Sequence, residues 1–440
     1  MKATWPQIVF YAVWLGLVVT IVSVWLGESQ PITSNPSDIL LNLARLSGLM
    51  GAFLLLWQLV LISRAPWLEQ IHGYDQWTRI HRVNGLAAFL LITLHIPLVV
   101  GGYGLLAQLT PPQQILQFWS DFAYIPLAIV GYILLVVIVL SSVSIVRKKA
   151  KYELWYGLHL LNYVVLGIVF WHQVAHGLTL SSVEWFLYMW YGLHILVVVH
   201  LLINRFALGA WLWWRHWFYV ERIEREAGSV TSVYISGRHM ERFRFEPGQF
   251  AKWRFLQKGL WREEHPFTIS QAYNGITLRL SVKAVGDFTS RLDGLVLGSR
   301  VLISQPLGDF TLELARHSRL LLVGGGIGIT PLRAMLEAAP DDMEVDMVYV
   351  VQAEQDAVFL SELKNLTQPR NKRLHLVTTR ERAPEADYKL FESGILSKVL
   401  SDSPSSVYIC GPDSMVDDVS QYLRELGVDD RDIHTERFSF

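Results

Sequence analysis

Six uncharged, apolar runs dominate the first half of the chain. They cover residues 8–27, 46–63, 83–108, 122–146, 154–183 and 185–204. An α-helix needs about 20 apolar residues to cross a bilayer, and each run is close to that length or longer. The first run exceeds the core of a signal peptide and no small-residue cleavage site follows it, so we expect an uncleaved helix. The pattern therefore predicts six membrane-spanning helices.

From about Tyr219 onward the pattern changes. Short alternating runs separated by turns come first, and strand–helix units follow, as in a soluble region. The stretch "WLWWRHWFY", 211–219, lies between the two parts and resembles the aromatic belt at a membrane interface. We expect a multi-domain membrane protein with an all-α six-helix bundle at 1–217, an antiparallel β-barrel at 218–315 and an α/β domain at 316–440.

Composition agrees with a membrane protein. Hydrophobic residues make up 52% of the 440-residue chain, charged residues make up 18%, and there are 17 tryptophans. The net charge of −1 gives no basic excess for a phosphate backbone, so we expect no nucleic-acid partner. The single cysteine, Cys410, provides neither an intramolecular disulfide nor a cluster for zinc or iron–sulfur ligation.

Basic residues mark the side of the membrane that we expect to be cytoplasmic. Lys and Arg are absent from the connections at 28–37, 105–121 and 177–183. By the positive-inside rule both termini, and the second half of the chain, face the cytoplasm from a cell (inner) membrane. The basic positions behind this prediction are Arg64, Arg79 and Arg82 in the second connection and Arg147, Lys148, Lys149 and Lys151 in the fourth.

Two histidines stand on the third span and two on the fifth. His81 and His95 are fourteen residues apart, so they leave nearly one face of an ideal helix, about 21 Å apart along its axis. His159 and His172 are thirteen apart on the fifth span, which runs in the same direction. His81 then comes level with His159, and His95 with His172. Facing neutral imidazoles in an apolar setting are what six-coordinate haem iron needs, so we expect two stacked haems.

This pairing requires an irregular fifth span. Thirteen residues leave His172 about 140° away from His159 on an ideal helix, so we expect a π-bulge, a kink or an unwound segment if both bind haem. His176 is a competing outer ligand. The alternative for any membrane histidine is an ordinary hydrogen-bonded contact between helices, which is what we expect of the remaining ones in this region, His72, His194, His200 and His216.

Three motifs in the β-like stretch suit a flavin. They are "EPGQF" (246–250), "HPFTIS" (265–270) and "LSVKAVGDFTSRL" (280–292). A flavin site needs a groove for the isoalloxazine ring, a hydroxyl or amide near its N5 and donors for the pyrophosphate, and residues 265–268 and 286–289 offer such groups. Each motif alone is more often a turn than a site, but their order favours a flavin site.

Two further motifs suit a nicotinamide nucleotide. "LLLVGGGIGITPLRAML", 320–336, is typical of a buried strand, a glycine loop and a helix with Pro331 near its start. Glycines let the backbone approach a pyrophosphate, whose charge the helix N-terminus attracts, although a tight structural turn is the alternative for one such loop. "VYICGPDSM", 407–415, is a second buried strand, and its small polar turn suits the edge of a nicotinamide pocket.

From about Leu40 onward the chain resembles the NADPH oxidase and ferric reductase superfamily, in its minimal bacterial form. That family joins a six-helix haem domain to a ferredoxin–NADP reductase-type dehydrogenase. "HPFT", "GGGIGITP", "CGP" and "ERFSF" occur in the family's order, and the paired histidines with "HRVNG" match its third and fifth spans. The resemblance implies two haem b groups, FAD bound at 218–315 and NADPH or NADH bound at 316–440.

The resemblance also implies roles for individual residues. Phe267 would lie along the flavin and Thr268 near its N5, and Cys410 would border the nicotinamide. The family ends in an aromatic that covers the flavin where hydride arrives, and "ExF" aligns Phe438, which we favour over Phe440. The cofactor-binding set so implied is His265, Pro266, Phe267, Thr268, Gly286, Thr289, Gly324, Gly325, Gly326, Gly328, Thr330, Thr379, Arg380, Cys410, Gly411 and Phe438, with His81, His95, His159 and His172 as iron ligands.

Two arginines carry finer expectations from the same resemblance. Arg45 on the second span resembles an arginine beside the outer haem, where it would pair with a propionate, although it also suits snorkelling to the headgroups. "TTRE", 378–381, resembles a stretch that takes the 2′-phosphate of NADP, so Thr379 and Arg380 favour NADPH. Gln352 stands where many relatives have arginine, and this leaves NADH open.

The implied function is electron transfer across the membrane. Cytoplasmic NAD(P)H would reduce FAD, and single electrons would pass through the inner haem and then the outer haem to an acceptor outside. We expect dioxygen, giving superoxide, because the short outer connections offer no obvious acidic or histidine cluster for iron. The alternatives are a ferric-chelate reductase, an electron donor to a quinone or a periplasmic partner protein, and a membrane-anchored flavoreductase with structural histidines. We expect no obligatory protein partner.

Overall fold

The computed structural model describes residues 5–28, 35–63, 65–69, 71–72, 74–143, 152–379, 394–402 and 404–438. The chain divides into two compact units, residues 1–206 and 207–440, and each is described by itself. This division places the helix α12 (Leu208–His216) in the second unit, whereas the sequence predicts a membrane domain that extends to residue 217.

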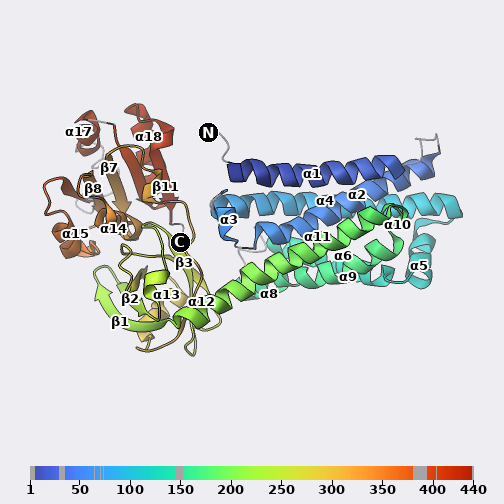
Figure 1. Ribbon diagram of the computed structural model, residues 1–440, viewed down its shortest axis with the longest axis horizontal. Helices are drawn as coiled ribbons and strands as arrows, with labels where there is room; N and C mark the ends of the chain where they lie inside the picture. Colours follow the sequence, from blue (N-terminus) through green and yellow to red (C-terminus); the bar gives the residue numbers. More distant parts are fainter. Residues whose placement is uncertain are drawn as a thin grey trace. The chain divides into compact units, whose positions relative to one another are not determined.

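Six helical stretches in the described part of the chain are long and apolar enough to cross a membrane, as the sequence predicts. Figure 1 shows the long helices of the first unit running side by side. The protein is therefore a multi-pass membrane protein. The stretches are α1 (Trp5–Glu28), α2 (Pro36–Leu61), α4 (Tyr74–Ala107), α6 (Ile125–Ser142), the pair α8 (Tyr152–Leu160) and α9 (Asn162–His176), and α11 (Glu184–Leu202), which continues through the π-helix η1 (Ile203–Ala207) into α12.

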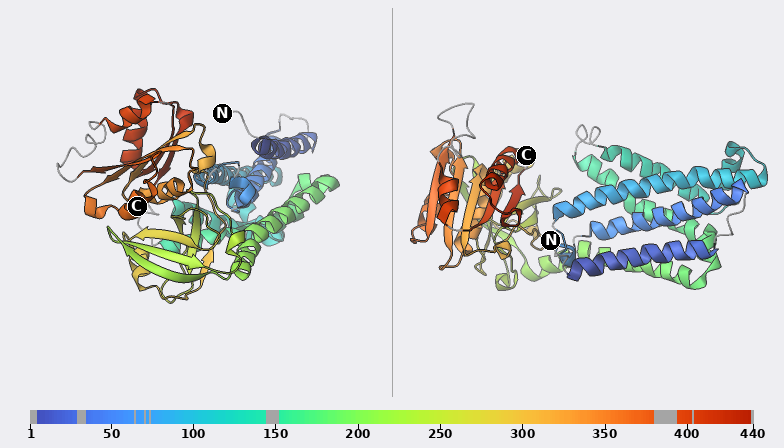
Figure 2. Two further views of the ribbon diagram at one scale, coloured as in Figure 1. Left: turned by 60° about the vertical axis from the view of Figure 1, so that its left-hand side comes forward. Right: turned by 90° about the horizontal axis from the view of Figure 1, so that it is seen from above.

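The connections of the first unit hold three short helices, α3 (Pro66–Glu69), α5 (Pro111–Asp121) and α10 (Leu178–Ser182). The closest packing in this unit is between α2 and α4, which run alongside each other in the right-hand view of Figure 2. A Cβ on Gly51 of α2 would lie 2.8 Å from the side chain of Ile92, so the glycine permits the approach. The Asn84 side chain donates to the Leu54 carbonyl at 2.9 Å, which fixes α4 against α2.

The β-rich part of the second unit consists of two three-stranded antiparallel sheets. One has the order β1 (Tyr219–Glu226), β2 (Val230–Ser236), β5 (Leu278–Lys283), and the other β4 (His265–Thr268), β3 (Phe250–Phe255), β6 (Val301–Ile303). Isolated bridges join the sheets at both edges, Ile269 to Leu280 and Tyr219 to Arg300. The antiparallel architecture is as expected, but the described strands do not form a continuous closed barrel, because the edge strands meet only at single bridges.

The rest of the second unit is a parallel five-stranded sheet with helices on both faces (Figure 2). Its order is β11 (Ile433–Arg437), β10 (Ser406–Gly411), β7 (Arg319–Gly325), β8 (Glu344–Val351), β9 (Lys372–Thr378). Leu320 and Leu322 of β7 pack in the core that includes α14 (Ile329–Ala338) and α15 (Leu360–Leu366). Leu321 and Val323 pack in the core that includes α17 (Ile395–Asp402) and α18 (Asp413–Glu425). Burial on both faces explains why this strand is apolar without alternation.

Short helices complete the second unit. They are η2 (Met240–Arg242), α13 (Asp287–Arg291), η3 (Leu292–Gly294), η4 (Leu312–Leu314), η5 (Gly326–Gly328), η6 (Glu354–Asp356) and η7 (Asp430–Asp432). An ion network ties the β-rich part to the parallel sheet. Arg279 of β5, which is 2% exposed, donates to both carboxylate oxygens of Glu362 on α15, at 2.9 and 3.1 Å. Arg333 of α14 donates to the same carboxylate at 3.0 Å. Burial opposes ionisation of Glu362, but the two guanidinium groups outweigh it and hold the pKa of that carboxyl below its usual range.

Candidate functional site

The inner histidines lie face to face. The ring centres of His81 on α4 and His159 on α8 are 6.1 Å apart, with 62° between the ring planes. Two metal–nitrogen bonds of about 2.0–2.1 Å, with about 1 Å from each nitrogen to its ring centre, separate ring centres by about 6 Å. The Nδ1 atom of His81 is buried and has no hydrogen-bond partner among the described residues. The two rings are therefore spaced so that they could hold one iron between them.

Neighbouring side chains hold the inner pair in place. Gln58 of α2 donates to the carbonyl of His81 at 2.9 Å, which fixes the turn of α4 that carries this histidine. The hydroxyl of Ser142 lies 3.5 Å from Nδ1 of His159, and the Trp155 ring centre lies 5.3 Å from the imidazole centre. A partner on Nδ1 leaves metal ligation to Nε2.

The outer histidine of α4 is oriented by the backbone of α2. Nδ1 of His95 donates to the carbonyl of Ala44 at 2.8 Å, and this hydrogen bond leaves Nε2 as the nitrogen with a lone pair for a metal. A Cβ on Gly48 would lie 2.8 Å from the same Nδ1, so only glycine leaves room for the ring. His172 of α9 is an electrostatic neighbour of His95, and its buried Nδ1 has no hydrogen-bond partner in the described part of the chain.

The fifth span is interrupted, as the sequence predicts for the case in which both of its histidines bind haem. α8 ends at Leu160 and α9 begins at Asn162, and Leu161 separates them. The N–H of Leu161 bonds the carbonyl of Leu158, three residues back, which tightens this turn relative to an α-helix. The break lies between His159 and His172, so the two rings are not bound to the spacing of one ideal helix.

His176 has a different environment from His172. Its Nε2 lies 2.6 Å from the carbonyl of Ala123, to which it donates, and its ring meets Phe122 edge-on at 5.5 Å. The other membrane histidines also have hydrogen-bond partners within the protein. His72 bonds Tyr11, His194 bonds the Trp190 carbonyl, His200 bonds Ser63 and His216 bonds the Arg238 carbonyl.

Arg45 lies on α2, next in sequence to the residue that orients His95. It follows Ala44, whose carbonyl holds His95. Its guanidinium donates to the side chain of Asn42 and to the Glu28 carbonyl, while its buried Nε has no partner among the described residues. The Nε–H of Arg45 is thus a buried donor that could serve an anionic group, and the sequence predicts that this arginine pairs with a propionate beside the outer haem.

The expected flavin residues gather on β4 and at the start of α13. Thr268 is buried and pairs with Phe250 in the sheet. The ring of His265 lies 4.0 Å from that of Phe288, and Phe267 is parallel to Phe288 within 17°, at 6.2 Å. Pro266 lies between His265 and Phe267 on the same strand. Phe288 was missed in the sequence analysis, although "VGDFTS" contains it beside Gly286.

The hydroxyl of Thr289 makes its hydrogen bonds with the loop that precedes α13. Its hydroxyl accepts from the N–H groups of Gly286 at 2.9 Å and Val285 at 3.0 Å and donates to the Gly286 carbonyl at 3.0 Å. These three bonds shape the loop in which Gly286 caps α13. Any contact of Thr289 with a phosphate must therefore be shared with, or replace, these local bonds.

The glycine loop after β7 lies at the carboxyl edge of the parallel sheet. Gly326 has φ +53°, a left-handed conformation that favours glycine. A Cβ on Gly328 would collide with the carbonyl of Cys410, so this glycine permits the loops after β7 and β10 to touch. Thr330, in the first turn of α14, donates to the Ile327 carbonyl at 3.0 Å. β7 lies where the strand order reverses, between β8 and β10, which is where doubly wound sheets bind nucleotides.

Cys410, Gly411 and Phe438 meet at the same edge. Cys410 pairs with Gly324 in the sheet, and the N–H of Phe438 donates to the Gly411 carbonyl at 3.2 Å. The Phe438 ring packs against the core that contains Cys410. Phe440 lies outside the described residues. The structure thus brings together Phe438 and the two glycine-containing loops predicted to hold the nucleotide.

Burial makes Cys410 an unreactive thiol. Its side chain is fully buried, and that burial, with the nearby Glu436 carboxylate, raises the pKa of the thiol. We expect iodoacetamide to alkylate the folded protein at least roughly hundredfold more slowly than the denatured protein, by intact-mass measurement. Raising the pH from 7 to 9 should hardly change the folded rate. Fast labelling of the folded chain would instead mean that the thiol is open to solvent.

The residues expected to choose between NADPH and NADH are described only in part. Thr379 follows β9, and its N–H donates to the Val351 carbonyl at the end of β8, at 3.0 Å. Gln352, the next residue after β8, is exposed. Arg380 lies outside the described residues.

Three family models match the chain, one for each expected part. They are a ferric reductase like transmembrane component at residues 47–170, an FAD-binding domain at 220–329 and an oxidoreductase NAD-binding domain at 322–421. Together they support transmembrane electron transfer from NAD(P)H.

Curated relatives include flavohemoproteins. That of Bacillus subtilis (strain 168) is 26% identical over 50% of this chain and 58% of its own length. That of Pseudomonas putida is 30% identical over 53% of this chain and 61% of its own length. A crystal structure of the flavohem-like FAD/NAD binding domain of nitric oxide dioxygenase from Vibrio cholerae is 24% identical, with a TM-score of 0.44, and covers 50% of this chain and 98% of that one.

A transmembrane ferric reductase-like domain that precedes FAD-binding and NAD-binding domains defines a known architecture. Six membrane-spanning helices, the antiparallel sheets and the doubly wound parallel sheet supply these parts in that order. The chain has the domain architecture of the NADPH oxidase and ferric reductase superfamily, in which an FAD-binding domain and an oxidoreductase NAD-binding domain follow the transmembrane part.

Proposed function

We propose that this protein transfers electrons from cytoplasmic NAD(P)H to dioxygen on the outer side of the cell membrane, giving superoxide. The observation that carries the proposal is the pairing of histidines from α4 with histidines from α8 and α9 at two levels. One histidine pair could hold a single redox group. Two histidine pairs about 21 Å apart along α4 could hold two redox groups, which would pass electrons across a bilayer.

Each histidine pair would hold one haem b through Nε2. Ala44 and Ser142 supply the partners that orient His95 and His159 for this role. His172 is the outer ligand in the proposal, because the ring nitrogen Nε2 of His176 is engaged by the Ala123 carbonyl. When bound, FAD accepts a hydride from the nucleotide and haem carries one electron at a time, so the flavin converts two-electron into one-electron transfer.

The cytoplasmic side of the proposal rests on the second unit. The loops at Gly326–Gly328 and Cys410–Gly411 would receive the nucleotide, and Phe438 would border the flavin face. Thr379 and Arg380 would favour the 2′-phosphate, and we infer NADPH as the preferred donor. Arg45 would face an anionic group at the outer haem, where its positive charge stabilises added electrons.

The test is NADPH-driven cytochrome c reduction by the purified full chain in detergent, loaded with FAD and haem. We expect superoxide dismutase to abolish most of the signal, because the reductant of cytochrome c would be superoxide. A parallel assay with NADH measures the nucleotide preference. If the rate is unchanged by dismutase, electrons leave directly to a metal or protein acceptor, and the ferric reductase or partner-linked alternative replaces the oxidase proposal.

A further inference from the structure

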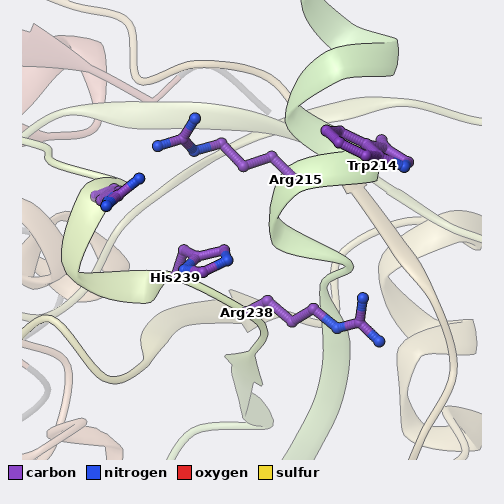
Figure 3. Close-up of a pocket in the computed structure, with 5 residues that line it drawn as sticks. Trp214, Arg215, Arg238 and His239 are labelled. Carbon is purple, nitrogen blue, oxygen red and sulfur yellow. The ribbon is translucent and has the colours of Figure 1, made fainter.

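A cationic pocket in the second unit lies outside the sites described above. It has a volume of about 250 Å³ and is lined by Trp214, Arg215, Arg238, His239 and Arg242. Figure 3 shows Trp214 and Arg215 projecting from α12, with Arg238 and His239 on the loop that follows β2. Drug-sized ligands occupy pockets of about 300–1,000 Å³, so this one suits a smaller group.

Two hydrogen bonds fasten the loop to α12. The N–H of Arg238 donates to the His216 carbonyl at 2.5 Å, and Nδ1 of His216 donates back to the Arg238 carbonyl at 3.0 Å. The His216 ring is 1% exposed and stacks on Phe218 at 5.1 Å and 15°. A Cβ on Gly237 would collide with the His216 carbonyl. The two walls of the pocket are therefore one preorganised piece, whose backbone needs little rearrangement on binding.

The lining carries positive charge without a buried acid to cancel it. Glu241 stands beside the pocket, with its carboxylate 3.6 Å from His239 and 3.7 Å from Arg242, and its side chain is 62% exposed. Arg215 lies over the Trp211 ring at 4.8 Å. Neither Arg215 nor Arg238 has an ion-pair partner among the described residues. Guanidinium groups bind phosphate oxygens in bidentate geometry, so the pocket suits an anionic phosphate better than a neutral group.

The chain places this pocket at the end of the sixth span. The last candidate membrane helix covers Glu184–His216 and so includes Trp214 and Arg215 in its final turn. Trp214 is 71% exposed and Trp211 is 48% exposed. Exposed tryptophans beside arginines at the end of a span are typical of the headgroup layer, where lipid phosphates are found.

We propose that this pocket binds the phosphate of an anionic lipid headgroup from the cytoplasmic leaflet. Arg215, Arg238 and Arg242 donate to the phosphate oxygens, and Trp214 lies against the lipid beside it. The site is separate from the predicted haem, flavin and nucleotide residues, so it does not depend on the proposed electron acceptor. A free inorganic phosphate has the same recognition chemistry, and the experiment separates the two sources.

Calorimetric titration of the purified full chain in dodecyl maltoside tests the site. The probes are dihexanoyl-phosphatidylglycerol, the zwitterionic dihexanoyl-phosphatidylcholine and inorganic phosphate. The test variant combines Arg215→Gln, Arg238→Gln and Arg242→Gln. The matched control combines Arg370→Gln, Arg424→Gln and Arg431→Gln, three arginines of the parallel-sheet part that lose the same charge elsewhere. FAD content and melting temperature check that each variant is folded.

We expect phosphatidylglycerol to bind the wild-type and control proteins and to bind the test variant at least about tenfold more weakly, because charge-assisted hydrogen bonds are lost. Phosphatidylcholine should bind weakly to all three. Arg238→Lys keeps the positive charge but loses the bidentate geometry of the guanidinium, so it should weaken lipid binding less than Arg238→Gln. These two single variants replace the triple variant in the test if the triple variant does not fold. If inorganic phosphate at millimolar concentration binds or competes, a soluble phosphate replaces the lipid as ligand. Equal lipid binding by the test and control variants overturns the site.

Discussion

The variant His172→Ala is expected to bind one haem instead of two, because a ligand of the outer iron is removed. Its rate of NADPH-driven cytochrome c reduction should fall at least about hundredfold, because the path of the electrons is interrupted. The variant His176→Ala, changed four residues further along α9, should keep both haems. His176 is the matched control because it is the other histidine near this end of the helix, and its Nε2 donates to the Ala123 carbonyl.

The physical reason for the difference lies in the partners of the two rings. The Nε2 of His172 makes no hydrogen bond with the described residues, so this nitrogen is available to bind a metal. His95, its electrostatic neighbour, is turned by the Ala44 carbonyl so that Nε2 carries the lone pair. His172 is therefore matched to a ligand role, whereas His176 is satisfied by the backbone.

The measurements are the haem-to-protein ratio by pyridine haemochrome and the rate of cytochrome c reduction. NADPH–ferricyanide activity serves as an internal check, because ferricyanide can take electrons from the flavin and should respond little to His172→Ala. Loss of haem from His176→Ala instead of His172→Ala would reverse the ligand assignment. A wild-type protein without haem absorbance would leave the membrane-anchored flavoreductase as the better reading.

The variant Asp346→Asn is expected to destabilise the parallel-sheet part by about 3–5 kcal/mol, as the loss of one partner from a buried ion pair does. Asp346 of β8 has a side chain that is 1% exposed. It accepts from Arg319 at 3.1 Å, from Arg373 at 2.8 Å and from His375 at 3.0 Å. Removing the carboxylate charge leaves the Arg319 guanidinium, only 6% exposed, without its buried counter-ion.

Thermal inactivation of NADPH–ferricyanide activity measures this effect in the full chain. The midpoint should fall by roughly 10 °C for Asp346→Asn. Asp429→Asn is the control, because Asp429 is a surface carboxylate that caps a short helix, a role that asparagine fills equally well. Its midpoint should not change. If both midpoints are unchanged, the buried network does not contribute to stability.

The carboxylate of Asp346 also makes the stability of the parallel-sheet part depend on pH in strong acid. Burial alone would raise the pKa of Asp346, but the hydrogen bonds from Arg373, His375 and Arg319 outweigh it and hold the pKa well below the ordinary value of 3.8. A lowered pKa contributes stability that is fully present above that ordinary value and is lost as the pH falls through the folded-state pKa. The difference between wild type and Asp346→Asn should therefore be constant near neutral pH and shrink only in strong acid.

Local patterns in the sequence predicted most of the architecture. Apolar runs of membrane length located the six spans, since a bilayer imposes its thickness on any helix that crosses it. The glycine loop at 324–328 was recognisable because an apolar strand precedes it and a helix with Pro331 near its start follows it. The closed barrel was not predictable in the same way, because closure depends on how edge strands such as β1 and β6 meet, and they meet at one bridge.

The sequence by itself determined that this is a six-span membrane protein with flavin and nucleotide domains, and it identified the four histidines as candidates, because period, spacing and residue type are local properties. Only the tertiary structure decided how those histidines are held. The Ala44 carbonyl, the space left by Gly48 and the break at Leu161 come from backbone positions that have no distinctive side chain. Arg215 of the cationic pocket likewise stands more than twenty residues before Arg238 and Arg242 in sequence, and the fold of α12 against the loop after β2 gathers the three arginines into one site.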